Sequence, residues 1–304
     1  MLVPEMTPTS YYGQPVLKPP VWTPEIGVYL FTGGLGGASA MLAAAARAQG
    51  NDVLARRALL TSFAAVSVSP LLLVKDLGVP RRFLNMLRVF KPTSPMSVGS
   101  WVLAGAGVSM GTATACDVLG VMPRVRRVAE VSGALLGAPL ATYTAVLLAG
   151  TAVPAWHEAR GQLPFVFAGS SLASAGAAAV VLTPPRQARA ARRLTVLGAA
   201  LEVAALETLR RRMPAESGEP YRSGAPGRFS GAATRLTVNG ALTVALAGRR
   251  RPAAVVGGLA VLAGAMCQRW AIFTAGRVSA TDPKYVVTPQ RRRVDAARAT
   301  ATRP

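Results

Sequence analysis

Along this chain, long blocks of apolar residues alternate with short polar connectors. A helix needs about 20 predominantly apolar residues to cross the hydrocarbon core of a bilayer, and eight blocks come close to that length. The pattern therefore predicts eight transmembrane helices, of which the seventh is the weakest because Asn239 and Gly240 interrupt it. The predicted segments are residues 25–46, 55–74, 97–118, 129–150, 163–183, 191–209, 231–248 and 252–274.

The connector between the second and third segments, Val74–Trp101, is long and basic. Pro80 and Pro92 bound a stretch in it, and proline suits the first turn of a helix and also stops one. Within that stretch, apolar residues recur at i, i+3, i+4 and i+7, which defines one helix face: Phe83, Met86, Leu87 and Phe90. We expect a short amphipathic helix in the membrane–water interface; a solvated loop is the alternative.

The composition is that of a membrane protein and not of a soluble domain. The chain is 51% hydrophobic and 15% charged, whereas soluble domains carry about 25% charged residues. We therefore expect an all-α, multi-pass protein of the cell membrane. The net charge of +21 comes mostly from arginines between the apolar blocks, where they set topology and contact lipid head groups. No nucleic-acid partner is expected, and arginines on both sides of the membrane leave the orientation open.

The two ends of the chain differ from the apolar blocks. Residues 1–24 are polar and proline-rich, with two tyrosines and Trp22 next to the membrane. Such a segment suits docking onto a partner, although a disordered tail is the alternative. Residues 276–304 form a basic C-terminal tail.

The residues that commonly hold redox cofactors are scarce. His157 is the only histidine, so two axial histidines for a haem are excluded. Cys116 and Cys267 are far apart and match neither iron–sulfur nor zinc spacing. We expect no haem, iron–sulfur cluster or metal in this chain, so any electrons must come from another subunit.

Several ionisable residues lie at the predicted membrane boundary. Glu25 opens the first segment, Lys75 and Asp76 end the second, and His157 follows the fourth. Charges at such positions are costly, and they are usually functional or paired. An even number of crossings places Glu25, Asp76 and His157 on the same face as the N-terminus; simple capping or snorkelling is the alternative.

Glu202 lies near the middle of segment 191–209. A carboxyl group at that depth faces the interior of a helix bundle and is protonated or paired. Asn239 in the seventh segment is a candidate partner. The two residues form a candidate proton path; an interhelical hydrogen bond of Glu202 is the alternative.

Three stretches carry long, specific patterns: KPPVWTPEIGVYLFTGG (18–34), KDLGVPRRFLNMLRVFKPTSPMSVGSW (75–101) and YTAVLLAGTAVPAWHEARGQLPFVFAGS (143–170). They resemble the NrfD/PsrC family of polysulfide reductase-like, quinone-interacting membrane subunits, and the resemblance covers roughly residues 11–175. It implies eight helices in two four-helix bundles, 25–158 and 159–275, with a quinone site in the first. It also implies an iron–sulfur partner subunit docked near that site and a catalytic subunit, such as a molybdopterin enzyme, beyond it.

The resemblance also suggests roles for single residues. Tyr143 matches a tyrosine of the family's quinone site, and Asp76 matches its loop aspartate. Where some members place asparagine and histidine early in the first segment, this chain has Trp22 and Glu25. We therefore assign head-group contact or proton transfer to Asp76, Glu25 and His157. Cofactor binding is assigned to Tyr143, Trp22, Lys75 and Arg82, the last two of which could also hold an acidic partner surface.

The sequence thus favours a quinone-binding membrane subunit that exchanges electrons with an iron–sulfur partner and is not catalytic alone. A proton- or ion-translocating subunit, with Glu202 and Asn239 in its path, is the first alternative. A purely structural membrane anchor is the second.

Overall fold

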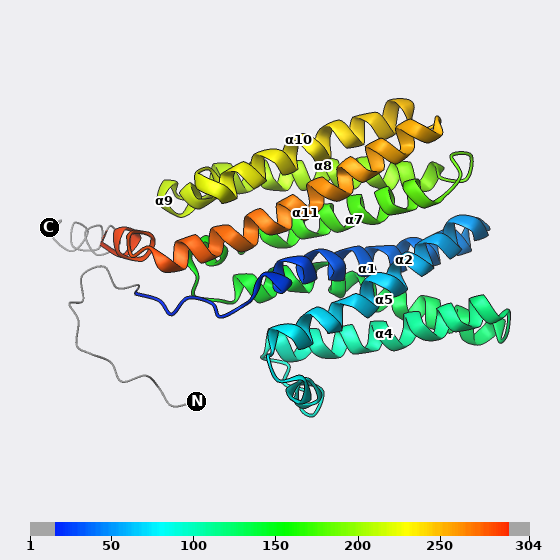
Figure 1. Cartoon of the computed structure of the whole chain (residues 1–304), viewed down its shortest axis with the longest axis horizontal. Coiled ribbons are helices and arrows are strands. Elements are labelled where there is room, and N and C mark those ends of the chain that lie inside the picture. The colour runs from blue at the N-terminus through cyan, green and yellow to red at the C-terminus, as the bar shows by residue number, and fades with distance from the viewer. Residues whose placement is uncertain (1–15, 292–304) are drawn as a thin grey trace, which may run out of the picture.

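The computed structural model describes residues 16–291, and this part of the chain contains helices and loops without strands. Figure 1 shows the long helices running side by side along one axis. Their bounds are α1 Pro24–Ala48, α2 Asp52–Asp76, α4 Pro95–Leu119, α5 Pro123–Ala149, α7 Leu163–Leu182, α8 Arg189–Arg212, α10 Gly224–Ala247 and α11 Arg251–Thr281. Each overlaps one of the predicted segments, although α5 and α10 begin earlier and α11 ends later than expected. Residues 1–15 and 292–304, which belong to the two predicted tails, lie outside the described residues.

Six of these helices are long and apolar enough to cross a membrane: α1, α2, α4, α5, α7 and α11. The prediction of an all-helical, multi-pass membrane protein is thereby confirmed. The helices α8 and α10 do not meet the same criterion of length and hydropathy. Charged residues account for this, since α8 begins and ends in arginines and carries Glu202, and α10 contains Arg228 and Arg235.

The predicted amphipathic helix from Pro80 to Pro92 is shorter than expected. The structure has a 3₁₀ turn η1 at Pro80–Arg82, one α-helical turn α3 at Phe83–Met86, and turns thereafter. Ser97 holds the turns around Val89 and Lys91 in place. Its hydroxyl accepts a hydrogen bond from the Lys91 N–H and donates one to the Val89 carbonyl, both at 3.0 Å. Proline at position 92 also disfavours helical backbone in the preceding residue. The helical pattern therefore ends before Phe90.

Consecutive long helices form antiparallel hairpins, and the hairpins pack into two halves that meet along α1, α7 and α11. In Figure 1 the blue and cyan helices of the first half lie below the yellow and orange helices of the second. Glycines allow the closest approach within the first half. A Cβ on Gly37 of α1 would collide with the carbonyl oxygen of Gly137 in α5, and the reverse also holds. Glycine at both positions therefore lets the backbones of these two helices approach closely.

One end of the molecule carries several of the candidate functional residues predicted from the sequence, among them Trp22, Glu25, Asp76 and His157. We call it the N-terminal face: residues 16–25, the C-terminal ends of α2 and α11, and the short helix α6 at Pro154–Glu158. Helix α11 reaches Thr281, beyond the predicted end of the second bundle at 275. Two further short elements, α9 at Ala215–Gly218 and η2 at Glu219–Tyr221, lead into α10.

The opposite face is closed by a network of ion pairs in the first half. Arg47 Nη2 lies 2.9 Å from Asp117 Oδ1 and 2.9 Å from Glu130 Oε1, and both carboxylates are almost fully buried. Arg126 lies 2.7 Å from Asp117. The network connects α1, α4 and α5 with charges that solvent barely screens. Both carboxylates thus pair with Arg47 of α1, and Arg126 from the adjacent arginine cluster joins the network through Asp117.

Candidate functional site

Asp76 and Thr23 join the start of α1 to the end of α2. The backbone N–H of Thr23 donates to Asp76 Oδ1 at 2.7 Å, and the Thr23 hydroxyl donates to the same oxygen at 2.8 Å. Hydrogen bonds to a charged carboxylate are stronger than neutral ones. Asp76 therefore anchors the residue that precedes α1, while its Oδ2 makes no hydrogen bond with the described residues.

Glu25 and Lys75 form an ion pair beside this junction. Lys75 Nζ lies 2.5 Å from Glu25 Oε1, and the side chains are 71% and 20% exposed, respectively. Because solvent screens an exposed pair, it contributes little to stability. The fold thus brings three of the predicted residues, Glu25, Lys75 and Asp76, together on the N-terminal face.

Trp22 and α6 pack next to this group. The Trp22 and Trp156 rings stack with centroids 5.5 Å apart, and the buried Trp156 Nε1 donates to the Ile272 carbonyl at 2.7 Å. Trp156 occupies space above Gly276 of α11, where a Cβ would collide with its ring. The stack therefore fixes Trp22 between the start of α1 and the end of α11.

His157 follows Trp156 but does not join the carboxylates. Its side chain is exposed and makes no hydrogen bond with the described residues. It lines a cavity of about 340 Å³ together with Ser217 and Tyr285, and neither Asp76 nor Glu25 lines that cavity. His157 is therefore on the predicted face, in a separate pocket next to the C-terminal segment.

Tyr143 lies deeper in the first half. Its ring packs directly over Gly99 of α4, where a Cβ would come within 2.6 Å of Tyr143 Cζ. It belongs to an apolar cluster with Tyr29 and Leu73, so the cluster reaches the turn of α2 that carries Lys75 and Asp76. The Tyr29 hydroxyl is buried and has no hydrogen-bond partner among the described residues.

Arg82 is exposed on η1 and makes no side-chain contact that joins it to the carboxylates. Exposed apolar residues accompany it in the same loop, including Leu84 and Phe90. Phe90 packs edge-to-face against Trp101 at 6.3 Å. This combination of arginine, aromatic and aliphatic side chains suits a membrane–water interface, and places Arg82 at the rim of the face.

Glu202 is buried in α8 next to Gly169 and Ser170 of α7, and the charge of Arg269 in α11 acts on it. Arg269 is buried as well: its Nη2 donates to the Phe167 carbonyl at 2.9 Å and to Ser171 Oγ at 3.0 Å. Glu202 Oε2 and Arg269 Nε and Nη1 have no partner among the described residues. Two ionisable side chains thus lie within the helix assembly with unused hydrogen-bonding capacity.

The structure does not bring Asn239 into contact with Glu202. Asn239 is exposed on α10, and the residue that acts on Glu202 is Arg269. Arg269 was not predicted from the sequence. It is an ionisable residue inside segment 252–274, which is the same signal that identified Glu202.

Tyr29 was also missed. Glu25, Tyr29 and Thr32 have helical i, i+4, i+7 spacing, which places them on one face of α1. That spacing could have identified Tyr29. Thr23 offered no such signal, because its contact with Asp76 spans 53 positions of the chain.

The donors and acids of the N-terminal half fit a particular kind of ligand. Tyr29 and Tyr143 have hydroxyl groups without hydrogen bonds to the described residues, in an apolar cluster. Glu25 and Asp76 add carboxylates at the end of that cluster. Such a site suits a largely apolar molecule with oxygen atoms at one end, to which hydroxyl groups can donate hydrogen bonds and with which a carboxyl group can exchange a proton.

Fold and site together define a multi-pass helical membrane protein with a polar site at one membrane face. A family model described as "Polysulphide reductase, NrfD" matches residues 14–209, nearly two thirds of the chain. The chain therefore belongs to the NrfD family, and membership implies a membrane subunit of a quinone-linked oxidoreductase. A comparison with curated proteins gives no match.

Proposed function

We propose that this chain binds quinone or quinol in its first half and exchanges electrons with an iron–sulfur subunit docked on the N-terminal face. The observation that carries the proposal is the Tyr29 hydroxyl, buried without a partner in the cluster that contains Tyr143. A buried polar group without a partner is costly, and a ligand oxygen would relieve that cost. Family membership supplies the class of ligand.

A bound quinone supplies two-electron chemistry coupled to proton uptake or release. Tyr29 and Tyr143 orient its oxygens by hydrogen bonding. Asp76 has one oxygen free of the Thr23 contacts and can exchange a proton, and Glu25 connects the site to solvent through its exposed partner Lys75. Trp22 closes the site from the side of α6.

The proposed architecture extends to all eight long helices. The helices α8 and α10 are 24 residues each, which is longer than the span of a bilayer core requires. They run alongside α7 and α11 in Figure 1. We take them as the sixth and seventh spans, which makes each half a four-helix bundle.

The docking surface consists of the exposed basic residues Lys75 and Arg82 with the loop between α2 and α4. An iron–sulfur subunit with an acidic patch would complement these charges. It would connect the quinone site to a catalytic subunit, such as a molybdopterin enzyme, outside the membrane.

Quinone-linked turnover of the assembled complex tests this proposal. Asp76→Asn keeps an oxygen for both Thr23 donors but cannot hold a proton, and Tyr29→Phe and Tyr143→Phe each remove one hydroxyl. Each change is expected to lower turnover at least tenfold, as removal of a positioned acid–base or hydrogen-bonding group does, while the complex still assembles.

The matched controls lie on the same face. Asp282→Asn keeps the acceptor for the Lys284 N–H, and Tyr285→Phe removes a hydroxyl from the separate His157 cavity. Both should turn over like the unaltered complex. Full turnover in all three site variants would exclude the proposed site.

A second function rests on the buried Glu202 and Arg269. Charged groups with unused hydrogen-bonding atoms inside the membrane mark proton paths, so proton translocation is the alternative activity. In a reconstituted complex, Glu202→Gln should abolish proton movement and leave quinone turnover intact. Glu207→Gln is the control, because Glu207 lies on the same helix in an exposed pair with Arg211. Proton movement that survives Glu202→Gln would make the pair purely structural.

A further inference from the structure

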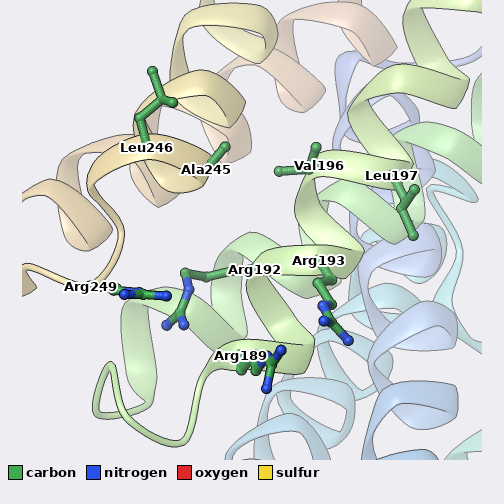
Figure 2. Close-up of a pocket in the computed structure, with 8 residues that line it drawn as sticks. All are labelled: Arg189, Arg192, Arg193, Val196, Leu197, Ala245, Leu246 and Arg249. Carbon is green, nitrogen blue, oxygen red and sulfur yellow. The ribbon is translucent and has the colours of Figure 1, made fainter.

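A cavity of about 760 Å³ lies between the N-terminal part of α8 and the C-terminal end of α10, at the end of the molecule opposite the N-terminal face. Figure 2 shows arginine side chains at its lower edge and aliphatic side chains above them. The lining residues are Arg189, Arg192, Arg193, Arg249, Val196, Leu197, Ala245 and Leu246. A volume of this size accommodates a small-molecule ligand.

The arginines of this cavity lack carboxylate partners in the part of the chain that the structure describes. None of the ion pairs there includes an arginine of the cavity. Arg192 donates to the Pro185 carbonyl at 2.6 Å, and the charges of Arg189 and Arg249 repel that of Arg192. A cluster of like charges without counter-charges is unfavourable, and a bound anion would relieve it.

The neighbouring Arg251 shows a different use of arginine. Its guanidinium donates to the carbonyls of Val180, Val181 and Thr183 at the end of α7. Arg189 and Arg249 make no hydrogen bond with the described residues. Arg251 therefore caps a helix, whereas Arg189 and Arg249 remain available to a ligand.

The aliphatic wall begins further along the helices. Leu197 is eight residues after Arg189, which is about 12 Å along a helix axis. Leu197 is 68% exposed and Leu246 is 86% exposed. In a multi-pass membrane protein, this order places the arginines at a helix end and the leucines towards the hydrocarbon. The cavity thus matches a ligand with an anionic head and an apolar tail.

We propose that this cavity binds an anionic phospholipid, with its phosphate among the arginines and an acyl chain against Leu197 and Leu246. Basic pockets between membrane helices recognise such head groups, and guanidinium groups bind phosphate by paired hydrogen bonds. The proposal requires membrane insertion and is independent of quinone binding at the other face.

Binding of phosphatidylglycerol and of phosphatidylcholine with identical chains to the delipidated full-length protein tests the charge requirement. Native mass spectrometry can measure both. We expect phosphatidylglycerol to bind more tightly. The double variant Arg189→Gln/Arg249→Gln should weaken that binding about thirtyfold, because each arginine near an anionic lipid contributes a factor of about five.

The control Arg124→Gln/Arg127→Gln removes the same charge at the same end of the molecule, from the first turns of α5. It should leave phosphatidylglycerol binding unchanged. Equal binding of the two lipids by the unaltered protein, or equal losses in the two double variants, would overturn the proposal.

A second pair of variants distinguishes a lipid from a free anion. Leu197→Ser and Leu246→Ser alter exposed side chains, so the fold should tolerate them, and they should weaken lipid binding severalfold. Inorganic phosphate should bind weakly and compete poorly with phosphatidylglycerol. If phosphate competes as well as lipid, and the serine variants bind phosphatidylglycerol normally, the cavity is a site for a soluble anion instead.

Discussion

Gly99 provides the space that the Tyr143 ring occupies, and Gly99→Ala tests this contact. The alanine Cβ would lie 2.6 Å from Tyr143 Cζ and 2.7 Å from Cδ2. Favourable carbon–carbon contacts lie at about 3.5–4.0 Å, and Cε2 of the ring is nearer to the added Cβ than either of these atoms, so the ring must move by about 1.5 Å or more. Buried Leu103 and Leu140 belong to the same cluster, so the ring cannot shift without displacing packed side chains.

Overpacking of this kind costs about 1–3 kcal/mol of unfolding free energy. The same displacement moves the Tyr143 hydroxyl, so quinone-linked turnover should fall together with stability. Replacing the ring by a smaller side chain should remove the clash. The double variant Gly99→Ala/Tyr143→Leu should therefore be less destabilised than the two single changes added together, by about 0.5–3 kcal/mol.

Unfolding of the purified protein in mixed micelles by a titrated denaturing detergent measures these differences. Gly107→Ala is the matched control on α4, because its Cβ would meet Val66 Cγ1 at an ordinary 3.7 Å. It should leave both stability and turnover unchanged. If Gly99→Ala is as stable as Gly107→Ala, or if the two changes at positions 99 and 143 are additive, the packing argument is refuted.

Two further changes test the ends of the first half in the same unfolding assay. Arg47→Met leaves the buried carboxylates of Glu130 and Asp117 without their shared partner and should cost about 3–5 kcal/mol; a loss below about 0.5 kcal/mol would show that the network contributes nothing. Thr23→Val removes one of the two donors to Asp76 and should cost about 1 kcal/mol. If that variant is as stable as the unaltered protein, the contact with the Thr23 hydroxyl does not help Asp76 to anchor the start of α1.

The two halves of the molecule use arginine for different purposes at the same face. At the face opposite the candidate site, Arg47 is surrounded by carboxylates and is part of the packing. In the cavity between α8 and α10, arginines are gathered without carboxylates. In the sequence, arginines cluster in connectors of both halves. Only the contacts of these arginines with carboxylates distinguish a structural network from a binding site.

The sequence predicted those candidate residues that can be identified by their type and by their position along the chain. Asp76, Glu25 and Lys75 were identified as charges at a membrane boundary, and the fold places them together. His157 met the same criterion but lines a different cavity, because α6 turns its side chain towards the segment around Tyr285. Tyr29 was overlooked because an aromatic residue in an apolar block resembles ordinary core.

By itself, the sequence determined the helical class, the membrane location, the positions of the long helices along the chain and the family. These follow from properties local in the chain: the length of an apolar block, prolines at helix starts, and contiguous motifs. Only the tertiary structure decided which side chains meet. The contacts of Thr23 with Asp76, of Tyr143 with Gly99 and of Arg269 with Phe167 join residues that are far apart in the sequence. They depend on how helix faces pack, which no local pattern encodes.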